Sequence, residues 1–512
     1  MDVRRICKIL LLFSFLCGEG ETQANECVAY RVDGEAIACV CNATYCDYPS
    51  DDVPKEGSSY WYATDKQGQR MKQLEQKFGS CGGSPPDETL TVDSNKKYQT
   101  IIGFGGAFTD SAGINLGKLS PATRDQLIRA YYDRKKGSGY TLGRIPIGAT
   151  DCSTRPYTYD DFANDTSLEH FALAKEDYDY KIPYLKKALE LNSETLFLGA
   201  AWTAPLWMKI SGNLNGLSFL REDYYQTYAD YLIKFLDEYK RNGVNVWAIS
   251  TGNEPLSSLI FNYPSTTMAW TPRSMADWIA NYMGPTLASS SHKETVILAL
   301  DDSRPLLPWF VEPTFWNENA TKYVAGIGVH WYLDFITPAD LLDETHDEFP
   351  NKFIILSESS TSPPIWGTPK IKTESWRHGE KYILSIIEYM NHWAAGWVDW
   401  NLVLDTTGGP NWQHVYLDAA IIANPEKDEF YKQPIYYAIQ HFSKFVVRGS
   451  VRISITDTDT IKSTAFQTPS GEVVVVLYNR GTTTKRIVLN DSQKGKLCLE
   501  LSPLSMNTLR YI

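Results

Sequence analysis

The sequence predicts an α/β protein in which a (β/α)₈ TIM barrel is joined to an all-β, sandwich-like domain built from N- and C-terminal segments. Two observations predict the barrel: eight apolar, strand-like runs lie between residues 98 and 402, and amphipathic helical stretches separate them. A third observation predicts the β domain, because after about residue 450 the chain changes to short strands parted by Gly, Ser, Asp and Thr. A chain of 512 residues is long enough for both parts.

The first predicted element is a secretory signal peptide at residues 1–24. Arg4, Arg5 and Lys8 precede an apolar run from Ile9 to Cys17 that is too short to span a membrane, and small and polar residues follow. We therefore expect a soluble mature protein in a lumen or outside the cell. The formal charge of −12 and the pI near 5.3 argue against a nucleic-acid partner and are compatible with an acidic compartment.

Residues 25–50 are predicted to form a disulfide-rich β segment. An oxidising compartment favours two local disulfides over a zinc site among four clustered cysteines: Cys27, Cys39, Cys41 and Cys46. Three further cysteines leave an odd number, so at least one thiol should be free: Cys81, Cys152 and Cys498. Glycosylation is expected at four Asn-x-Ser/Thr sequons: Asn42, Asn164, Asn319 and Asn490.

Residues 51–97 lack helical periodicity, and we expect them to join residues 450–512 in the β-sandwich domain. Residues 98–449 are assigned to the barrel. Its eight predicted strands are QTIIGFG, YTLGRIPI, ETLFLGAAW, VNVWAIS, ETVILAL, VAGIGVHW, KFIILSE and GWVDWNL.

In a barrel of this kind the catalytic residues lie at the C-terminal ends of the strands. Every predicted strand ends in polar or aromatic side chains of the sort that hold a sugar. In chain order they are Gly103–Gly106 with Asp110, Arg144 with Asp151, Trp202, Asn253 with Glu254, Asp301 with Asp302, His330 with Tyr332, Glu358, and Trp400 with Asn401.

Several of these residues have a simpler explanation. GFGG lacks the third glycine of a dinucleotide-binding loop and fits a tight turn. Arg144 could be only an ion-pair partner, His330 a packed histidine, and the two aspartates at 301 and 302 a helix cap. The eight histidines show no HxH or HExxH spacing, so we expect no metal and no cofactor.

Glu254 and Glu358 are harder to explain as structural residues. They follow the fourth and seventh predicted strands, which open onto a common mouth, and a retaining glycosidase needs two carboxyl groups about 5–5.5 Å apart. One must stay ionised as the nucleophile, and the other must hold a proton, its pKa raised by the neighbouring charge. Asn253 can bond to a sugar hydroxyl beside Glu254, so Glu254 is predicted to be the general acid/base.

Together these motifs resemble those of the lysosomal acid β-glucosidase (glucosylceramidase) family. The similarity runs from ECVAYRVDGEAIACVCNATYCD to the C-terminal strands. It includes GFGGAFTDSA, AWTAPLWMK, the Asn-Glu-Pro at 253–255, GVHWYLDF, LSES, GWVDWNL, GGPNW and FYKQPIYYAIQHFSKF.

The resemblance implies roles for individual residues. Glu254 would be the acid/base and Glu358 the nucleophile. Asp151, Trp202, Asn253 and Trp400 would hold glucose, with His330 and Tyr332 positioning the nucleophile, Arg144 neutralising charge at the pocket floor and Tyr263 bordering the aglycone entrance. Cys27 would pair with Cys39, and Cys41 with Cys46. Val415 and Ser360 depart from the family pattern, which expects Asn and Cys there; the first departure puts one sugar contact in doubt.

The resemblance also implies the substrate and the setting. The chain would cleave glucosylceramide in membranes by double displacement, in the lysosome lumen, helped by anionic lipid and a lipid-presenting activator protein. Exposed aromatic residues such as Tyr263 and Trp366 could meet lipid. Two alternatives remain: a secreted or lysosomal relative that acts on steryl glucosides or glycans, and a catalytically silent carbohydrate-binding or trafficking protein.

Overall fold

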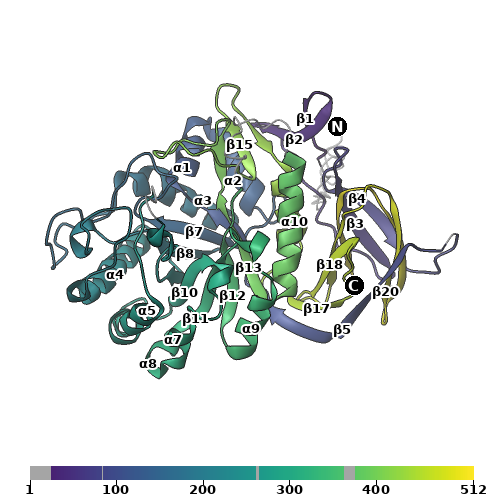
Figure 1. Cartoon of the computed structure of the whole chain (residues 1–512). Helices are drawn as coiled ribbons and strands as arrows, with labels where there is room; N and C mark the ends of the chain where they lie inside the picture. Colours follow the sequence, from purple (N-terminus) through teal and green to yellow (C-terminus); the bar gives the residue numbers. More distant parts are fainter. Residues whose placement is uncertain (1–24, 84, 261–264, 362–374) are drawn as a thin grey trace, which may run out of the picture.

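The computed structural model describes residues 25–83, 85–260, 265–361 and 375–512. The predicted signal peptide, Tyr263 and Trp366 lie outside these ranges. A closed eight-stranded parallel barrel occupies one side of the molecule and a β-sandwich the other (Figure 1). The predicted fold class is confirmed.

The barrel strands pair in chain order, with the last strand closing onto the first. Each predicted apolar run overlaps one of them, because strands buried on both faces are largely apolar. They are β6 (Gly103–Ala107), β7 (Leu142–Ile147), β8 (Leu196–Ala201), β9 (Ala248–Ser250), β10 (Val296–Ser303), β11 (Val324–His330), β12 (Phe353–Glu358) and β13 (Ala394–Asn401).

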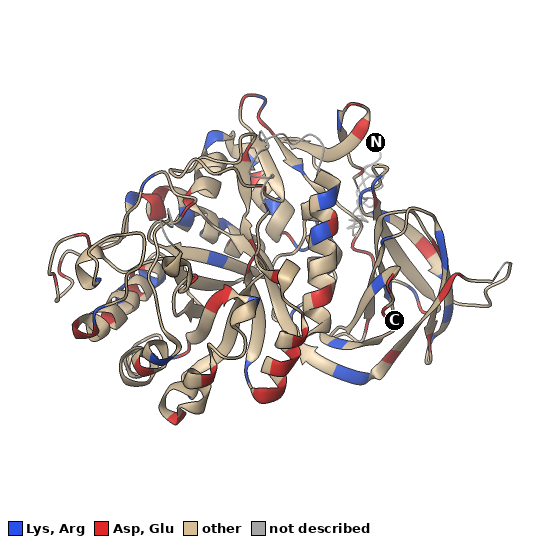
Figure 2. Cartoon of the chain, viewed as in Figure 1, with Lys and Arg blue, Asp and Glu red and all other residues tan. Residues whose placement is uncertain are grey.

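Helices cover the outside of the barrel. The longest, α4 and α10, each bury one face against it. Figure 2 shows acidic residues along α9 at the outer surface. The helices are α1 (Asp110–Lys118), α2 (Pro121–Tyr132), α3 (Ile182–Leu191), α4 (Tyr225–Arg241), α5 (Pro272–Trp278), α6 (Gly284–Ser289), α7 (Glu312–Trp316), α8 (Glu318–Thr321), α9 (Asp340–Glu348), α10 (Ser375–Asn391) and α11 (Pro434–Ser443).

The sandwich combines strands from both ends of the chain around its own apolar core. Its edge strands β21 and β4 approach each other, and a disulfide joins Cys498 of β21 to Cys81 in the loop before β5. The strands are β3 (Ser58–Asp65), β4 (Lys72–Lys77), β5 (Glu88–Thr100), β17 (Val451–Ile455), β18 (Ile461–Gln467), β19 (Val473–Asn479), β20 (Lys485–Asp491), β21 (Gly495–Leu501) and β22 (Ser505–Tyr511).

A separate five-stranded sheet attaches the N-terminal segment to the barrel. Hairpin β1 (Ala29–Val32)–β2 (Glu35–Asn42) pairs with β16 (Glu429–Lys432), followed by β15 (Ile421–Asn424) and β14 (Val403–Asp405). Strand β14 directly follows barrel strand β13, so this sheet is anchored close to the C-terminal ends of the barrel strands.

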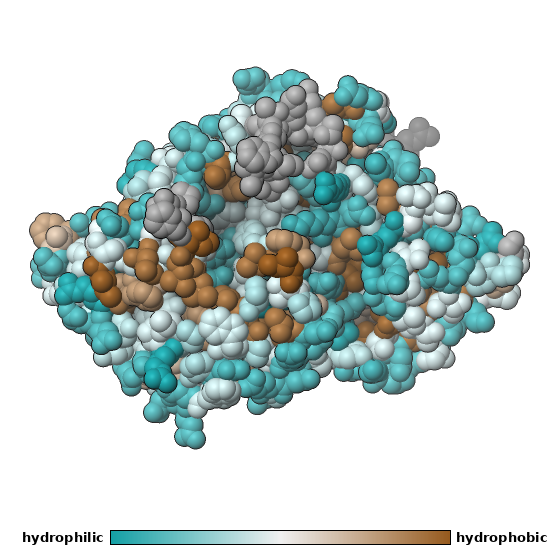
Figure 3. Space-filling view, viewed as in Figure 1, coloured by the Kyte–Doolittle hydropathy of each residue, from teal (hydrophilic) through white to brown (hydrophobic). Residues whose placement is uncertain are grey.

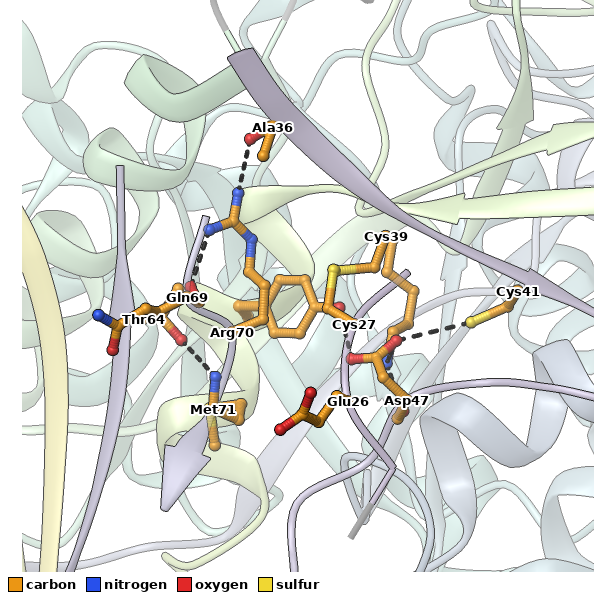
Figure 4. Close-up of a disulfide and its surroundings, with 12 residues drawn as sticks. Glu26, Cys27, Ala36, Cys39, Cys41, Asp47, Thr64, Gln69, Arg70 and Met71 are labelled. Carbon is orange, nitrogen blue, oxygen red and sulfur yellow. Dashed lines mark hydrogen bonds and ion pairs between the residues drawn. A yellow bond between two sulfur atoms is a disulfide. The ribbon is translucent and has the colours of Figure 1, made fainter. Parts of the chain in front are cut away.

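Two disulfides fix this N-terminal segment: Cys27–Cys39 and Cys41–Cys46, the pairs that the resemblance implies. Figure 4 shows Arg70 beside the first of them, donating to the Ala36 carbonyl (Nη2–O 3.0 Å). Among the described residues Cys152 is the free thiol, and it is buried. In these same ranges, every helix is too short or too polar to cross a bilayer.

Candidate active site

A cavity of about 730 Å³ opens at the C-terminal ends of the barrel strands. The polar residues lie at or just beyond the C-terminal ends of the parallel strands, which meet at the mouth of the barrel. Seven residues predicted to cleave or hold the sugar line it: Asp151, Trp202, Asn253, Glu254, Tyr332, Glu358 and Trp400.

Two carboxylates meet at the floor of the cavity. Glu358 is the last residue of β12, and Glu254 lies four residues beyond β9 in the left-handed region (φ 44°). One carboxylate oxygen of each and a ring nitrogen of His330 all lie within 4.8 Å of one another. This separation matches a nucleophile paired with an acid/base, and it is too small for the water that an inverting pair must accommodate.

Arg144 and Tyr332 hold the carboxylate of Glu358. The fully buried Arg144 guanidinium donates to Glu358 Oε2, to Asp301 (Nη2–Oδ2 2.9 Å) and to Asn253 (Nη2–Oδ1 2.7 Å). The Tyr332 hydroxyl donates to the other Glu358 oxygen (OH–Oε1 2.5 Å). Burial lowers the pKa of Arg144, but the charges of Asp301 and Glu358 raise it by more than burial lowers it. The guanidinium therefore remains charged.

His330 connects the second carboxylate to the same network. Its Nδ1 lies 3.1 Å from Glu254 Oε1, and its Nε2 lies 3.1 Å from Asp301 Oδ1. Burial lowers the pKa of His330, but the charge of Glu358 and the hydrogen bonds to Asp301 and Glu254 outweigh it and raise the pKa to about 10. The imidazole is therefore protonated, a form that cannot ligate a metal.

The protonated His330 changes what we expected of Glu254. Burial raises the pKa of Glu254, but the hydrogen bond and charge of His330, with the hydroxyl of Ser257 (Oγ–Oε2 2.9 Å), lower it below the usual value. The predicted rise from like-charge repulsion is therefore wrong. The imidazolium of His330 contacts Glu254 and carries a proton beside it.

Two other carboxyls in the pocket wall hold protons instead. Burial, and then the charges of Glu358 and Glu254, raise the pKa of Asp151 to about 7. Burial and the charge of Glu254 likewise raise the pKa of Asp302 to about 7. Below neutral pH the cavity therefore carries less negative charge than its four carboxyl groups suggest.

Two indoles form the side wall of the cavity. Trp202 and Trp400 stack with ring centroids 5.1 Å apart, and the guanidinium of Arg144 lies 5.0 Å from the ring centroid of Trp202. Such a wall offers an apolar face to the C–H groups of a sugar ring.

The other residues named from the sequence differ in where they lie. Tyr263 is outside the described residues. Val415 is 36% exposed and does not line the cavity, whereas Leu417 does. Ser360 lines it beside the nucleophile strand. Of the sequon asparagines, Asn164 and Asn319 are exposed and Asn42 and Asn490 half-buried.

The sequence places Asp301 at a strand tip, with a helix cap as the simpler alternative, and indicates no particular role for it in the site. In the structure it accepts from Arg144, His330 and the Ser357 hydroxyl (Oγ–Oδ1 2.6 Å). These three donors lower its pKa well below the usual range against the effect of burial. Paired acids at a strand tip are compatible with both interpretations, and only the fold distinguishes them.

Comparison with known proteins places this site in a family. Residues 101–446 match the glycosyl hydrolase family 30 TIM-barrel domain, and residues 449–509 match the family 30 β-sandwich domain. The chain is 38% identical over 488 residues to the lysosomal acid glucosylceramidase of Mus musculus, covering 93% of each chain.

Two further proteins share most of their length with the chain. It is 38% identical over 519 residues to putative glucosylceramidase 3 of Caenorhabditis elegans, covering 98% of each. A solved structure, the endo-β1,6-glucanase BT3312, superposes with a TM-score of 0.79 at 27% identity, covering 89% of this chain and 99% of that one.

Proposed function

The chain belongs to glycosyl hydrolase family 30 and is a retaining glycoside hydrolase, and from this premise we propose that it hydrolyses glucosylceramide to glucose and ceramide. The observation that carries the proposal is the carboxylate pair at the floor of a cavity whose mouth is apolar. The glucosylceramidases among its relatives support the substrate.

In this mechanism Glu358 attacks the anomeric carbon. Arg144 and Tyr332 each donate to its carboxylate, which fixes its direction. As the glycosyl–enzyme bond forms, the carboxylate loses its charge, and the Tyr332 hydroxyl becomes free to bond elsewhere in the pocket.

Glu254 protonates the leaving ceramide oxygen and later activates water. The His330–Glu254 pair together carries the proton that this step needs, with 3.1 Å between Nδ1 and Oε1. In the second step the glycosylated Glu358 is neutral, and Glu254 can accept a proton from water as general base.

The sugar is held by the walls of the same cavity. We assign contact with the faces of the sugar ring to Trp202 and Trp400, and hydrogen bonds to the sugar hydroxyl groups to Asp151 and Asn253. All four line the cavity that holds both carboxylates.

An apolar rim supports a lipid aglycone. Leu256, Ile260, Leu306 and Leu333 line the outer part of the cavity. Hydrophobic residues gather beside a hollow at the centre of the face in Figure 3. The loops after β9, β10 and β11 also carry exposed apolar residues: Leu259, Trp309, Phe335 and Ile336. A rim of this kind suits contact with a membrane that holds the substrate.

The setting follows from the same reasoning. We propose that the protein works in the lysosome lumen at the membrane surface, with secretion as the alternative. Anionic lipid and a lipid-presenting activator protein are its proposed partners, because the lipid substrate must be drawn from a bilayer for its glycosidic bond to reach Glu254.

The test is hydrolysis at acid pH by the purified protein, measured on glucosylceramide in vesicles with and without anionic lipid, and on a soluble β-1,6-glucan. We expect turnover of the lipid and little of the glucan. Turnover of the glucan alone would favour the glycan alternative, which the similarity to an endo-β1,6-glucanase supports. No turnover of any β-glucoside would favour a silent binding protein.

A matched pair of variants tests the rim. Ile336→Ser (67% exposed) should slow hydrolysis of vesicle-bound substrate several-fold and leave a soluble aryl β-glucoside unaffected. Val53→Ser (63% exposed), in the N-terminal segment and outside this cavity, should change neither rate. Equal effects of the two substitutions would remove the rim from the proposal.

A further inference from the structure

A buried ion cluster lies directly under the loop between β7 and residue 158, and the proposed chemistry does not use it. Lys181 Nζ lies 3.4 Å from Asp110 Oδ1 and 3.2 Å from Asp177 Oδ1, and all three side chains are buried. Burial lowers the pKa of Lys181, but the charges of the two aspartates raise it by more than burial lowers it. The ammonium therefore remains charged. An isolated structural ion pair rarely stabilises a core by itself, so the contacts of this cluster are informative.

The cluster bonds to the backbone at the end of β7. Lys181 Nζ donates to the Pro146 carbonyl (3.1 Å) and contacts the hydroxyl of Tyr157 (3.1 Å). The Tyr157 hydroxyl in turn donates to Asp110 (OH–Oδ2 3.0 Å). The cluster therefore fixes both ends of the loop that runs from Gly148 to Tyr157.

Ser153 links the cluster to the turn inside this loop. Its hydroxyl donates to Asp110 (Oγ–Oδ2 2.6 Å) and accepts from the backbone N–H of Thr150 (3.0 Å). From the opposite side, Trp412 donates to the carbonyls of Ser153 (N–O 2.8 Å) and Thr150 (Nε1–O 2.9 Å). Residues 150–153 are thus held between α1 and the loop after β14.

Asp151 is carried by this turn. Its carboxylate accepts from the neighbouring Cys152 thiol (Sγ–Oδ2 3.6 Å), and the Cys152 carbonyl accepts from the Ser111 hydroxyl (2.6 Å) and backbone N–H (2.9 Å). Because a neighbour in the same turn provides this contact, the direction of the carboxylate depends on the backbone geometry of residues 150–153.

We propose that Asp110 and Ser153 are positioning residues that orient the Asp151 carboxylate toward the sugar. Lys181 in turn holds Asp110 in place through its ion pair. This inference rests on the proposed function, because it requires Asp151 to bind a sugar hydroxyl. Neither residue lines the cavity, so both act through the turn. A carboxylate displaced by a fraction of an ångström loses much of a hydrogen bond's strength.

The experiment is a double-mutant cycle on the affinity for a glucose-like iminosugar, with kcat and KM for an aryl β-glucoside measured alongside. Ser153→Ala removes the link and leaves the ion cluster in place. We expect it to weaken inhibitor binding and raise KM about 10-fold, with a smaller change in kcat. Asp151→Asn should weaken binding by more, and adding Ser153→Ala to it should have almost no further effect.

Tyr239→Phe is the matched control for loss of one buried hydroxyl. Tyr239 donates to Asp177 (OH–Oδ1 2.7 Å) on the side of the cluster away from the turn. The substitution should lower the unfolding temperature and leave inhibitor affinity per folded molecule unchanged. The same loss of affinity in this variant would reduce the whole cluster to a stabilising role.

The two possible failures give different results. If Asp151→Asn leaves inhibitor affinity intact, the sugar-binding role proposed for Asp151 is wrong. If Asp151→Asn weakens binding but Ser153→Ala does not, or if the two effects multiply in the double variant, positioning through Asp110 and Ser153 is overturned and the proposed function stands.

Discussion

Glu358 receives hydrogen bonds on both carboxylate oxygens, from Arg144 on one side and Tyr332 on the other. These donors fix the direction of the nucleophile. Glu254 differs, because its contacts are an imidazolium and a serine hydroxyl. The two environments suit different roles, an oriented nucleophile and a carboxyl that shares a proton with its neighbour.

Replacing Glu358 with Gln should abolish turnover, because no covalent glycosyl–enzyme can form on an amide. The loss should be on the order of 10⁴-fold or more, as expected for a nucleophile that acts as a unit with its partner. Labelling by a mechanism-based β-glucose inactivator, mapped by peptide mass spectrometry, checks this. A label found on another carboxylate would contradict the assignment.

Replacing Glu254 with Ala should slow hydrolysis of substrates with poor leaving groups by about 10²–10⁴-fold, since the general acid is gone. An activated aryl glucoside should still glycosylate Glu358, and azide should restore turnover because it needs no general base. The product, read by NMR, should be β-glucosyl azide. An α-azide would indicate an inverting enzyme, and the absence of rescue would leave Glu254 a structural carboxylate.

The residue types at the strand tips were predictable from the sequence, whereas their protonation was not. Seven predicted residues line one cavity because parallel strands present their C-terminal ends together. The lowered pKa of Glu254 depends on a contact with His330, 76 residues away in the chain. Spacing along a sequence contains no information on that distance.

At the scale of elements, a disulfide closes the sandwich. Cys81 and Cys498 are separated by 417 residues, so the bond joins the two chain segments that build this domain. The odd number of remaining cysteines predicted at least one free thiol among these three, but it did not indicate which two would pair. The pairing depends on strand order, since β21 becomes an edge next to β4 only in the folded sheet.

Replacing both Cys81 and Cys498 with Ser should destabilise the sandwich on the order of 3–5 kcal/mol, because the cross-link restricts a very long loop in the unfolded chain. Thermal unfolding followed by circular dichroism measures the loss. Activity below the transition should be unchanged, since both residues lie outside the cavity. An unchanged unfolding temperature would mean that contacts between β21 and β4 suffice to hold the edge.

The strand pairing in the five-stranded sheet could not be predicted from the local sequence pattern. Barrel strands are continuous apolar runs, which periodicity detects. Strand β2 instead pairs with β16, with Cys39 opposite Lys432, across almost 400 residues. The N-terminal β segment was predicted, but its partner was not, because β14 to β16 are short and look like loops.

At the scale of the whole molecule, several buried carboxyls favour an acidic medium. Burial is the largest cause that raises the pKa of Asp399 to about 7, as it does for Asp151 and Asp302. In the unfolded chain such groups ionise near pH 3.9. Between about pH 4 and 7 the folded protein therefore binds more protons than the unfolded one, and its stability falls as pH rises through this window.

His441 acts in the opposite sense. It is fully buried, and burial lowers its pKa to about 3, so the folded state stays neutral where the unfolded state is protonated. Its contribution to stability is lost as pH falls from about 6.5 towards 3. Burial also raises the pKa of Asp160 and of Asp334 to about 6 and lowers the pKa of His346. The aspartates outnumber the histidines, and we expect the unfolding temperature to be higher at pH 5 than at pH 7.

Asp399→Asn isolates one of these groups outside the cavity. The amide resembles the protonated acid and can still accept from the Tyr382 hydroxyl, which lies 2.7 Å from Oδ1. The stability advantage of the variant over the native protein should grow by about 2 kcal/mol between pH 5 and pH 7, since one pKa unit corresponds to about 1.4 kcal/mol. Unfolding temperatures measured from pH 5 to 7 test this, with the exposed Asp459→Asn as control. A pH slope identical to that of the native protein would show that Asp399 is already ionised in the folded state at pH 5, and the preference for acid would then have to come from the pocket carboxyls alone.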